Sequence, residues 1–401
     1  MKKIYIILSL SLVCGFAFGQ NTWTQKASFG GTSRRGAVVF SIGTKGYIGM
    51  GYDGSFKSDF WEYNPSNDTW TQRADFGGGL RNAAAAFSVG TKGYVACGID
   101  ATIYHNDFWE YDPSTNSWTA KASYPGGGRY SFFSCSIGTK GYVGLGTASS
   151  SGPAQNDFWE YNPTNDSWLQ RTNFPGAVRT GCCGFVIGAK AYLGMGSNAL
   201  ISTTYSDWYE FDQANNSWSQ KSNFPGNGRT AFIAFTLGSA GFVGAGTTYP
   251  SNAYYNDFWE YYFWSDSWVQ RANFGGTARY TSGFSIGNVG YAGTGFDGSF
   301  KNDFWAYTPL DVDVNELNNQ MSISIFPNPF SSTATIAFGD DVNLSNLKIE
   351  ICDLAGRVVR EFVPENHLAQ MSSEGLSSGI YFVNIYEKGK LAESKKIVLS
   401  K

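Results

Sequence analysis

A short aromatic block, Asp-Phe-Trp-Glu-Tyr in its clearest copies, recurs along this chain about every 50 residues. The tryptophans assigned to this block are Trp61, Trp109, Trp159, Trp208, Trp259 and Trp305. A second series lies between the blocks: Trp23, Trp70, Trp118, Trp168, Trp218 and Trp268. Repeats of this length, made of short strands separated by glycines, are typical of a β-propeller in which each repeat forms one four-stranded blade.

Each repeat divides into four predicted strands. In the first repeat these strands are residues 36–40, 47–51, 59–63 and 68–72. We expect the first strand of every repeat to lie at the propeller axis, because it is rich in small residues such as Ala83–Ala86.

The order of the strands predicts how the ring closes. The chain starts with a lone fourth strand at Trp23, and its last third strand, at Trp305, has no fourth strand after it. Pairing the two leaves no open sheet edge. We therefore predict an all-β protein: a six-bladed β-propeller closed by an N-terminal strand, followed by a small C-terminal β-sandwich.

The two ends of the chain predict its domain organisation. Residues 1–19 have the basic start, apolar core and small-residue end of a secretory signal peptide, and no later stretch is apolar enough to span a membrane. We assign residues 20–309 to the propeller and the acidic, asparagine-rich residues 310–320 to a linker. Residues 321–401 are assigned to the sandwich. Its strand-like runs are 323–325, 347–351 and 381–385.

The repeats resemble kelch repeats over residues 20–308. The shared features are a tyrosine followed by glycines, a tryptophan near the end of the unit and an arginine that opens the next unit. The paired glycine of the kelch pattern is interrupted here, as in Gly49-Met50-Gly51. The function of a kelch subfamily therefore does not transfer to this chain.

The tail resembles the type A sorting domain of proteins exported by the type IX secretion system of Bacteroidetes-like bacteria. Four motifs carry the resemblance: Phe326-Pro327-Asn328-Pro329, Asp353-Leu354-Ala355-Gly356-Arg357, Leu376-Ser377-Ser378-Gly379-Ile380-Tyr381 and Lys395-Lys396-Ile397-Val398. The resemblance implies that the type IX machinery recognises residues 321–401 and that the tail is then removed. The mature protein would be secreted, either extracellular or anchored at the outer-membrane surface.

The net charge and the spacing of the cysteines argue against two classes of function, nucleic-acid binding and metal binding by cysteines. A net charge of −3 and a pI near 5.5 argue against general nucleic-acid binding. The cysteines of the repeats, Cys97, Cys135, Cys182 and Cys183, have no metal-ligand spacing. Two alternatives stay open for them: a Cys135–Cys183 disulfide between neighbouring inner strands and, favoured, buried free thiols that act as small apolar side chains.

Strand direction locates the face where a ligand would bind. In an antiparallel blade the connections after the second and fourth strands lie on one face. Those after the second strand vary in length and content, and such loops on a rigid scaffold usually carry function. Two of them are near copies, with residues 53–57 matching 297–301. The loops offer candidate residues for stacking on sugar rings or gripping an extended peptide: Asp53, Asp297, Tyr104, Tyr205, Tyr249, Tyr254 and Tyr255.

The same face carries one arginine per repeat: Arg34, Arg81, Arg129, Arg179, Arg229 and Arg279. A ring of guanidinium groups at the channel mouth would suit a carboxylate or sulfate ligand. However, an aspartate opens each third strand on that face: Asp59, Asp107, Asp157, Asp207, Asp257 and Asp303. We favour structural pairing of the two sets. About 9 to 10 Å separates them within a blade, so pairing requires extended side chains or a neighbouring blade.

Catalysis has little support in the sequence. The mature chain has two histidines, His105 and His367, which excludes a copper-radical oxidase. No nucleophile elbow, phosphate loop or zinc motif occurs. We expect no catalytic residue, cofactor or metal, and we predict a secreted binding propeller that recognises a glycan or a protein. The alternative is a sugar epimerase, mutarotase or other glycan-processing enzyme that uses Asp53, Asp297 or Asp100 as acid and base.

Overall fold

The computed structural model describes residues 21–148, 153–198, 200, 202–309, 323–339, 342–353, 357–387 and 390–400. The predicted signal peptide and linker, and a few residues of the variable loops, lie outside this part of the chain. The chain divides into two compact units between Leu310 and Asp311. A search of the described residues for a helix long and apolar enough to cross a membrane finds none.

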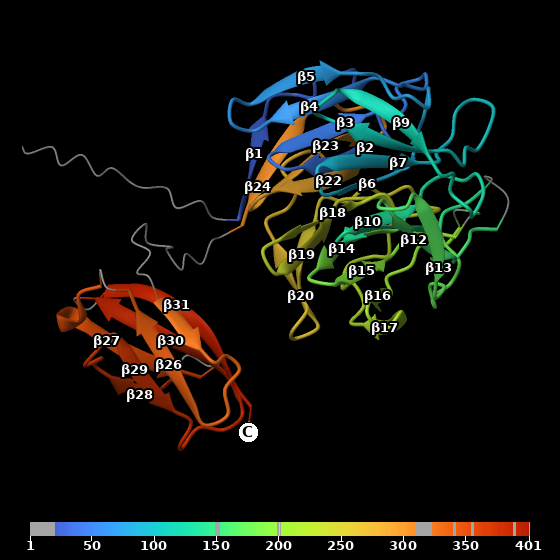
Figure 1. Ribbon diagram of the computed structural model, residues 1–401. Helices are drawn as coiled ribbons and strands as arrows, with labels where there is room; N and C mark the ends of the chain where they lie inside the picture. The colour runs from blue at the N-terminus through green and yellow to red at the C-terminus, as the bar shows by residue number, and fades with distance from the viewer. Residues whose placement is uncertain are drawn as a thin grey trace, which may run out of the picture. The chain divides into compact units, whose positions relative to one another are not determined.

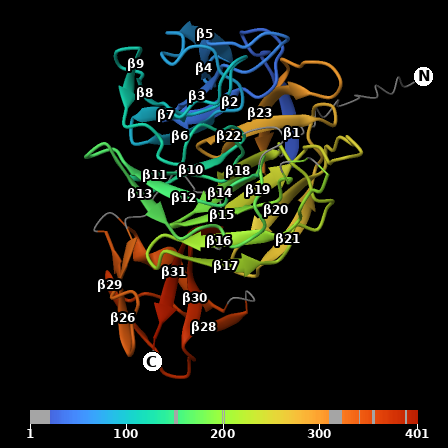
Figure 2. The same cartoon turned by 90° about the vertical axis from the view of Figure 1, so that its right-hand side faces the viewer.

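The first unit consists of six antiparallel sheets of four strands each, arranged around a common centre (Figures 1 and 2). The innermost strands are β2 (Val38–Ile42), β6 (Ala85–Val89), β10 (Phe133–Ile137), β14 (Cys183–Ile187), β18 (Ile233–Leu237) and β22 (Tyr280–Ile286). The second strands are β3 (Lys45–Gly49), β7 (Lys92–Ala96), β11 (Lys140–Gly144), β15 (Lys190–Gly194), β19 (Ala240–Gly244) and β23 (Val289–Phe296).

The two outer layers complete each sheet. The third strands are β4 (Phe60–Asn64), β8 (Phe108–Asp112), β12 (Phe158–Asn162), β16 (Trp208–Asp212), β20 (Phe258–Tyr262) and β24 (Phe304–Thr308). The outermost strands are β5 (Thr69–Arg73), β9 (Ser117–Lys121), β13 (Ser167–Arg171), β17 (Ser217–Lys221), β21 (Ser267–Arg271) and β1 (Thr22–Lys26). The predicted all-β class is confirmed, and the arrangement is that of a propeller.

The sheet that contains both ends of this unit is built from distant parts of the chain. Its strand order is β1-β24-β23-β22, and β1 pairs antiparallel with β24, with Trp23 opposite Tyr307 (blue beside orange in Figure 1). The predicted pairing of the N-terminal strand with the last third strand is confirmed. The innermost strands contact one another in cyclic order, and β2 lies against both β6 and β22.

The strand limits differ slightly from the predicted ones because residues with a left-handed backbone interrupt the extended conformation. Gly36 has a φ of 61°, and β2 begins only at Val38. Met50 has a φ of 58°, so β3 ends at Gly49. Asp68 has a φ of 54° and directly precedes β5. These backbone turns separate the strands from the loops of the variable face and from the turns of the opposite face.

The second tryptophan series joins neighbouring sheets. The indole Nε1 of Trp70 donates to the carbonyl of Ala27 in the preceding sheet at 3.0 Å. The amide of Ala27 donates in return to Asp68 Oδ1, also at 3.0 Å. The same reciprocal pair links Trp118, Trp168, Trp218 and Trp268 to Ala74, Ala122, Thr172 and Ser222. Five of the six sheets are thus tied to the sheet before them by a tryptophan, whereas the buried Nε1 of Trp23, in the sixth sheet, has no hydrogen-bond partner among the described residues.

Trp208 does not belong to the first tryptophan series, so that assignment was wrong. Trp208 is the first residue of β16 and pairs with Gly194. In the first repeat the equivalent residue is Phe60, the first residue of β4, which pairs with Gly49. The side chain of Trp208 is fully buried. Tyr209 takes the place of the tryptophan, because this copy of the block has the order Asp-Trp-Tyr-Glu-Phe.

The second unit contains a three-stranded sheet of order β25-β26-β29 and a four-stranded sheet of order β28-β27-β30-β31. The elements are β25 (Ile323–Phe326), β26 (Thr333–Phe338), the 3-10 helix η1 (Leu344–Asn346), β27 (Leu347–Cys352), β28 (Val358–Phe362), β29 (Leu368–Ser372), β30 (Gly379–Glu387) and β31 (Lys390–Leu399). The three predicted strands fall within β25, β27 and β30. Side chains of both sheets, among them Ile336, Met371, Ile349 and Val383, form one buried core.

Candidate functional site

The six repeat arginines lie in buried ion pairs. Arg34 donates from Nη1 and Nη2 to the two carboxylate oxygens of Asp59 at 2.5 and 2.8 Å. It also donates to the carbonyl of Met50 at 3.0 Å and lies over the ring of Phe29 at 5.0 Å. The corresponding pairs are Arg81–Asp107, Arg129–Asp157, Arg179–Asp207, Arg229–Asp257 and Arg279–Asp303. No more than 3% of any of these arginines is exposed.

The structure shows the structural pairing of the arginines that we favoured over an anion-binding ring at the channel mouth. Their guanidinium groups are covered and hold an aspartate of the same repeat, which the extended side chain reaches without a neighbouring blade. Burial opposes the charge of Asp59, but hydrogen bonds from Arg34 and Trp61 outweigh it and lower the pKa of Asp59. Each pair therefore stabilises its own repeat from within.

The aspartates of the two near-copy loops are also held within their own loops. Asp53 accepts hydrogen bonds from Thr32 at 2.7 Å and Ser55 at 3.0 Å and pairs with Lys57 at 2.9 Å. Burial opposes its charge, but these partners hold the pKa of Asp53 well below its usual range. Asp297 repeats the arrangement with its own threonine, serine and lysine. These carboxylates stabilise the loops from inside, which is a different role from the ligand contacts expected of them.

Asp100 and His105 form a local cluster. The backbone amides of Ile103 and Thr102 donate to Asp100 and hold its pKa well below its usual range. His105 Nε2 lies 3.0 Å from Asp100 and 2.8 Å from Arg81 Nη1. The aspartate is thus engaged by its own loop and by the neighbouring histidine.

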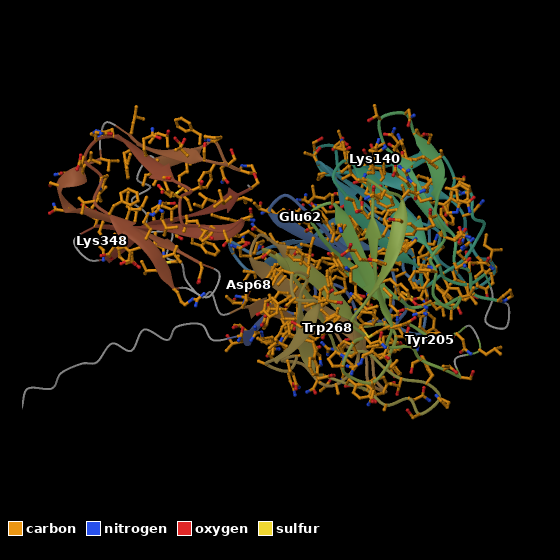
Figure 3. All side chains as sticks on the ribbon, turned by 90° about the horizontal axis from the view of Figure 1, so that it is seen from below. Glu62, Asp68, Lys140, Tyr205, Trp268 and Lys348 are labelled. Atoms are coloured by element: carbon orange, nitrogen blue, oxygen red, sulfur yellow. The ribbon has the colours of Figure 1, made fainter. Side chains whose placement is uncertain are left out.

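The candidate tyrosines divide into three groups. Tyr249 lines a cavity at the centre of the variable face. Tyr104 and Tyr254 pack against two other tyrosines that line this cavity, with ring centroids 5.6 Å from Tyr130 and 6.5 Å from Tyr280, respectively. Tyr205 (labelled in Figure 3) and Tyr255 instead lie 4.2 Å from the guanidinium carbons of the buried Arg179 and Arg229. The first two groups are therefore the ones that can shape a ligand site.

The cavity has a volume of about 290 Å³ and is lined by the residue that follows the buried arginine in each repeat. These residues are Arg35, Asn82, Tyr130, Thr180, Thr230 and Tyr280. The buried arginine never changes, whereas the next position differs in size, charge and polarity. We call this cavity, together with Tyr249 and the adjoining serines and threonines, the mouth cavity.

A belt of backbone hydrogen bonds fixes the rim of the mouth cavity. The amide of Ala83 donates to the carbonyl of Gly36 at 2.9 Å, and Ser131 donates to Ala83 at the same distance. The series continues through Gly181 and Ala231 to Thr281. Since these bonds run from repeat to repeat, the lining side chains stand on a rigid frame that is suited to selective binding.

Arg35 is the charged side chain among the residues that line the mouth cavity. Its guanidinium carbon lies 5.5 Å from the ring of Tyr52, 5.3 Å from Phe296 and 6.0 Å from Phe300, and its backbone pairs with Tyr52. The near-copy loops thus contribute aromatic rings around Arg35. Beside it, burial raises the pKa of Tyr280 to about 12, so this hydroxyl keeps its proton at neutral pH.

Arg35, Tyr130 and Tyr280 line the mouth cavity but were not among the residues predicted from the sequence. The available signal was the contrast between an arginine present in all six repeats and a following residue of four different types: Arg, Asn, Tyr and Thr. In a ring of repeats, an invariant position supports the scaffold and a varying neighbour lines the axis. That contrast would have located the mouth cavity.

The channel below the mouth cavity is lined largely by small residues, among them Ala84, Ala86 and Gly184, with some phenylalanines. The cysteines of the described residues are free, as the favoured alternative predicts; Cys97, Cys135 and Cys182 are buried, whereas Cys183 is partly exposed. Burial raises the pKa of Cys182 and Cys183 to about 12, which keeps both protonated at neutral pH. Among the residues that the structure describes, no cluster of histidine, cysteine and acidic side chains has the arrangement of a metal site.

Comparison with known protein families identifies two regions. The family described as Kelch motif matches residues 80–123, and the family described as Secretion system C-terminal sorting domain matches residues 324–400. The chain therefore carries a kelch motif and a type IX sorting domain, which indicates secretion and attachment at the cell surface.

Comparison with solved structures supports the fold. The protein titled "Structure of YjhT" superposes with a TM-score of 0.60 at 17% sequence identity, over 71% of this chain and 95% of that chain. At this identity the likeness concerns the fold alone. No curated protein matches the sequence.

Proposed function

We propose that this chain is a secreted binding protein whose six sheets are the six blades of a closed propeller, residues 20–309. Residues 310–320 link this propeller to a sorting sandwich, residues 321–401. The kelch motif supports a binding role, and the sorting domain supports export by the type IX machinery. The strand order β1-β24-β23-β22 supports closure by the N-terminal strand.

The ligand site in this proposal is the mouth cavity, and the ligand is a terminal sugar of a glycan. The observation that carries the proposal is a rigid cavity lined by one varying residue from each repeat. Its volume is at the lower end of ligand pockets, roughly 300 Å³, which suits one sugar ring better than an extended peptide. Tyrosine rings stack on the apolar face of a sugar, and the hydroxyls of Ser131, Thr180 and Thr230 match its hydroxyl groups.

A glycan array probed with the purified mature chain tests this proposal. We expect selective binding to a set of related terminal sugars, followed by unchanged recovery of the sugar. If the chain binds no glycan on the array but does bind members of a peptide library, the ligand is a protein and not a glycan.

The alternative of a sugar epimerase or mutarotase finds no supporting contact at the mouth cavity. It named Asp53, Asp297 and Asp100 as acid and base, and each of these carboxylates is engaged by its own loop with a lowered pKa. Among the described residues that line the cavity there is no carboxylate. NMR observation of ring-form interconversion of a bound sugar, accelerated by the protein, would nevertheless overturn a purely binding role.

A further inference from the structure

The arginines of the first unit differ in whether a carboxylate pairs with them. Six are paired with the aspartates described above, and three more, Arg73, Arg171 and Arg271, are paired with Glu62, Glu160 and Glu260. Among the arginines in the described part of the first unit, Arg35 alone has no carboxylate partner. A guanidinium without an acid at the mouth of a cavity has its charge available to a ligand.

The surroundings of Arg35 hold it in place without neutralising it. Tyr52, Phe296 and Phe300 surround the guanidinium with ring faces, which favour a cation. The acidic residues of the loops that supply these rings, Asp53 and Asp297, are already paired with lysines at 2.9 Å. The cavity therefore has a net positive charge.

The hydroxyl groups of neighbouring tyrosines add hydrogen-bond donors to the positive charge of Arg35. Burial raises the pKa of Tyr280 to about 12 and also raises the pKa of Tyr130 and Tyr249, so all three are protonated at neutral pH. Each is then able to donate a hydrogen bond. Since a carboxylate is an acceptor with two oxygens, it fits a guanidinium fork flanked by hydroxyl donors.

We infer that the mouth cavity binds a carboxylated sugar and that Arg35 receives its carboxylate. This inference rests on the proposed glycan-binding function and names the class of sugar. A sugar is favoured over an acidic peptide because tyrosines, serines and threonines line the cavity around this single arginine. A peptide rich in carboxylates would need further cations, and the other repeat arginines are buried.

The experiment is a glycan array and a calorimetric titration with the full mature chain. Each carboxylated terminal sugar is compared with its carboxyl-reduced counterpart, which has a hydroxymethyl group in place of the carboxylate. A third arm offers acidic peptides. The variants are Arg35→Gln and Arg35→Lys, with Arg73→Gln as the matched control, because it removes the same charge from the outer strand β5. Thermal melts verify that all variants are folded.

We expect the carboxylated sugar to bind about ten- to hundredfold more tightly than its reduced counterpart. Arg35→Gln removes this preference, Arg35→Lys restores only part of it, and Arg73→Gln retains it. Equal binding of both sugars, an unaffected Arg35→Gln variant, or binding of acidic peptides alone would overturn the inference. If only neutral glycans bind, the inference fails while the proposed function stands; if no glycan binds, the proposed function itself fails.

Discussion

At the scale of single residues, one polar unit recurs inside the repeats: an arginine, an aspartate and a tryptophan. In the first repeat Asp59 accepts from both Arg34 and the indole of Trp61. Tyr209 takes the tryptophan position in the fourth repeat. Burying an arginine is unfavourable unless a carboxylate pairs with it, so each arginine depends on its own aspartate.

The buried pairs predict a large effect of losing one partner. Arg179→Met leaves Asp207 without its guanidinium, and because the aspartate side chain is 22% exposed we expect the lower end of the range for a broken pair, about 3 kcal/mol of lost stability. Urea unfolding followed by tryptophan fluorescence measures this. Arg35→Gln is the control and changes the free energy of unfolding by less than about 1 kcal/mol, since Arg35 has ring contacts and no ion pair. An equal loss of free energy of unfolding in both variants would contradict the distinction between a buried ion-paired arginine and an arginine without an ion pair.

The lowered pKa values predict sensitivity to acid. The folded-state pKa values of Asp59, Asp53 and Asp297 lie below those in the unfolded chain. Their stabilisation is therefore complete above the unfolded pKa, about 4, and is lost as the pH falls through the folded values. We expect the unfolding temperature to fall between about pH 5 and pH 2.5, and to fall less steeply in Asp59→Asn. A melting temperature that stays constant across this range would refute the prediction.

At the scale of elements, the sheets are held together by side-chain contacts that reach the preceding sheet and by β1. Trp118 Nε1 donates to the carbonyl of Ala74, and Asn116 accepts from the amide of the same residue. Trp118→Phe removes the N–H donor together with part of a ring system that packs against Phe60 and Phe76, so we expect a loss of at least about 1 kcal/mol. Asn116→Ala should give a similar loss, and the double variant should cost less than the sum, because both side chains act on Ala74. If the losses in free energy of unfolding of the two single variants simply add in the double variant, the two side chains do not act together on Ala74.

Closure of the ring predicts the effect of removing β1. Deleting residues 20–27 removes the partner of β24 and exposes its edge. We expect aggregation or the loss of a single cooperative melt, measured by light scattering and calorimetry. An unchanged melting transition would show that β1 does not close the ring.

The sequence predicted the fold well because the fold depends on repeated positions. The second tryptophan series and the arginine–aspartate spacing mark contacts that recur in the sheets, so their period is visible. The mouth cavity depends on the opposite kind of position. Arg35 and Tyr280 occupy equivalent places in different repeats, the residue type at this place varies between repeats, and only the closed ring brings the two together. The sequence also did not reveal that Tyr205 and Tyr255 lie against the buried arginines Arg179 and Arg229, because this contact joins separate segments of the chain.

At the scale of the whole molecule, binding and export are assigned to separate units. The mouth cavity is built entirely from the first unit, and the sorting domain matches residues 324–400 in the second. We therefore predict that the tail is an export signal without a part in ligand recognition. This separation follows from the buried cores: the described residues of the first unit form six buried clusters between neighbouring sheets and those of the second unit form one of their own, so each unit has the packing that it needs to fold.

Truncation tests this separation. A chain that ends after Leu310 should keep a folded propeller with unchanged ligand affinity, and in the native host it should accumulate in the periplasm. Fractionation and titration of the purified protein provide the two readouts. Surface delivery without residues 321–401 would disprove the sorting role, and weakened binding would disprove the separation.

The most direct test of the account fills the mouth cavity. Thr180 lines the cavity, whereas Thr164 is exposed in the turn between β12 and β13, on the opposite face. Thr180→Trp and Thr164→Trp are each titrated with the glycan that binds most tightly on the array, after thermal melts confirm folding. We predict that Thr180→Trp weakens binding by at least about a hundredfold and that Thr164→Trp leaves it unchanged. Full affinity in a folded Thr180→Trp variant would contradict a ligand site at the channel mouth.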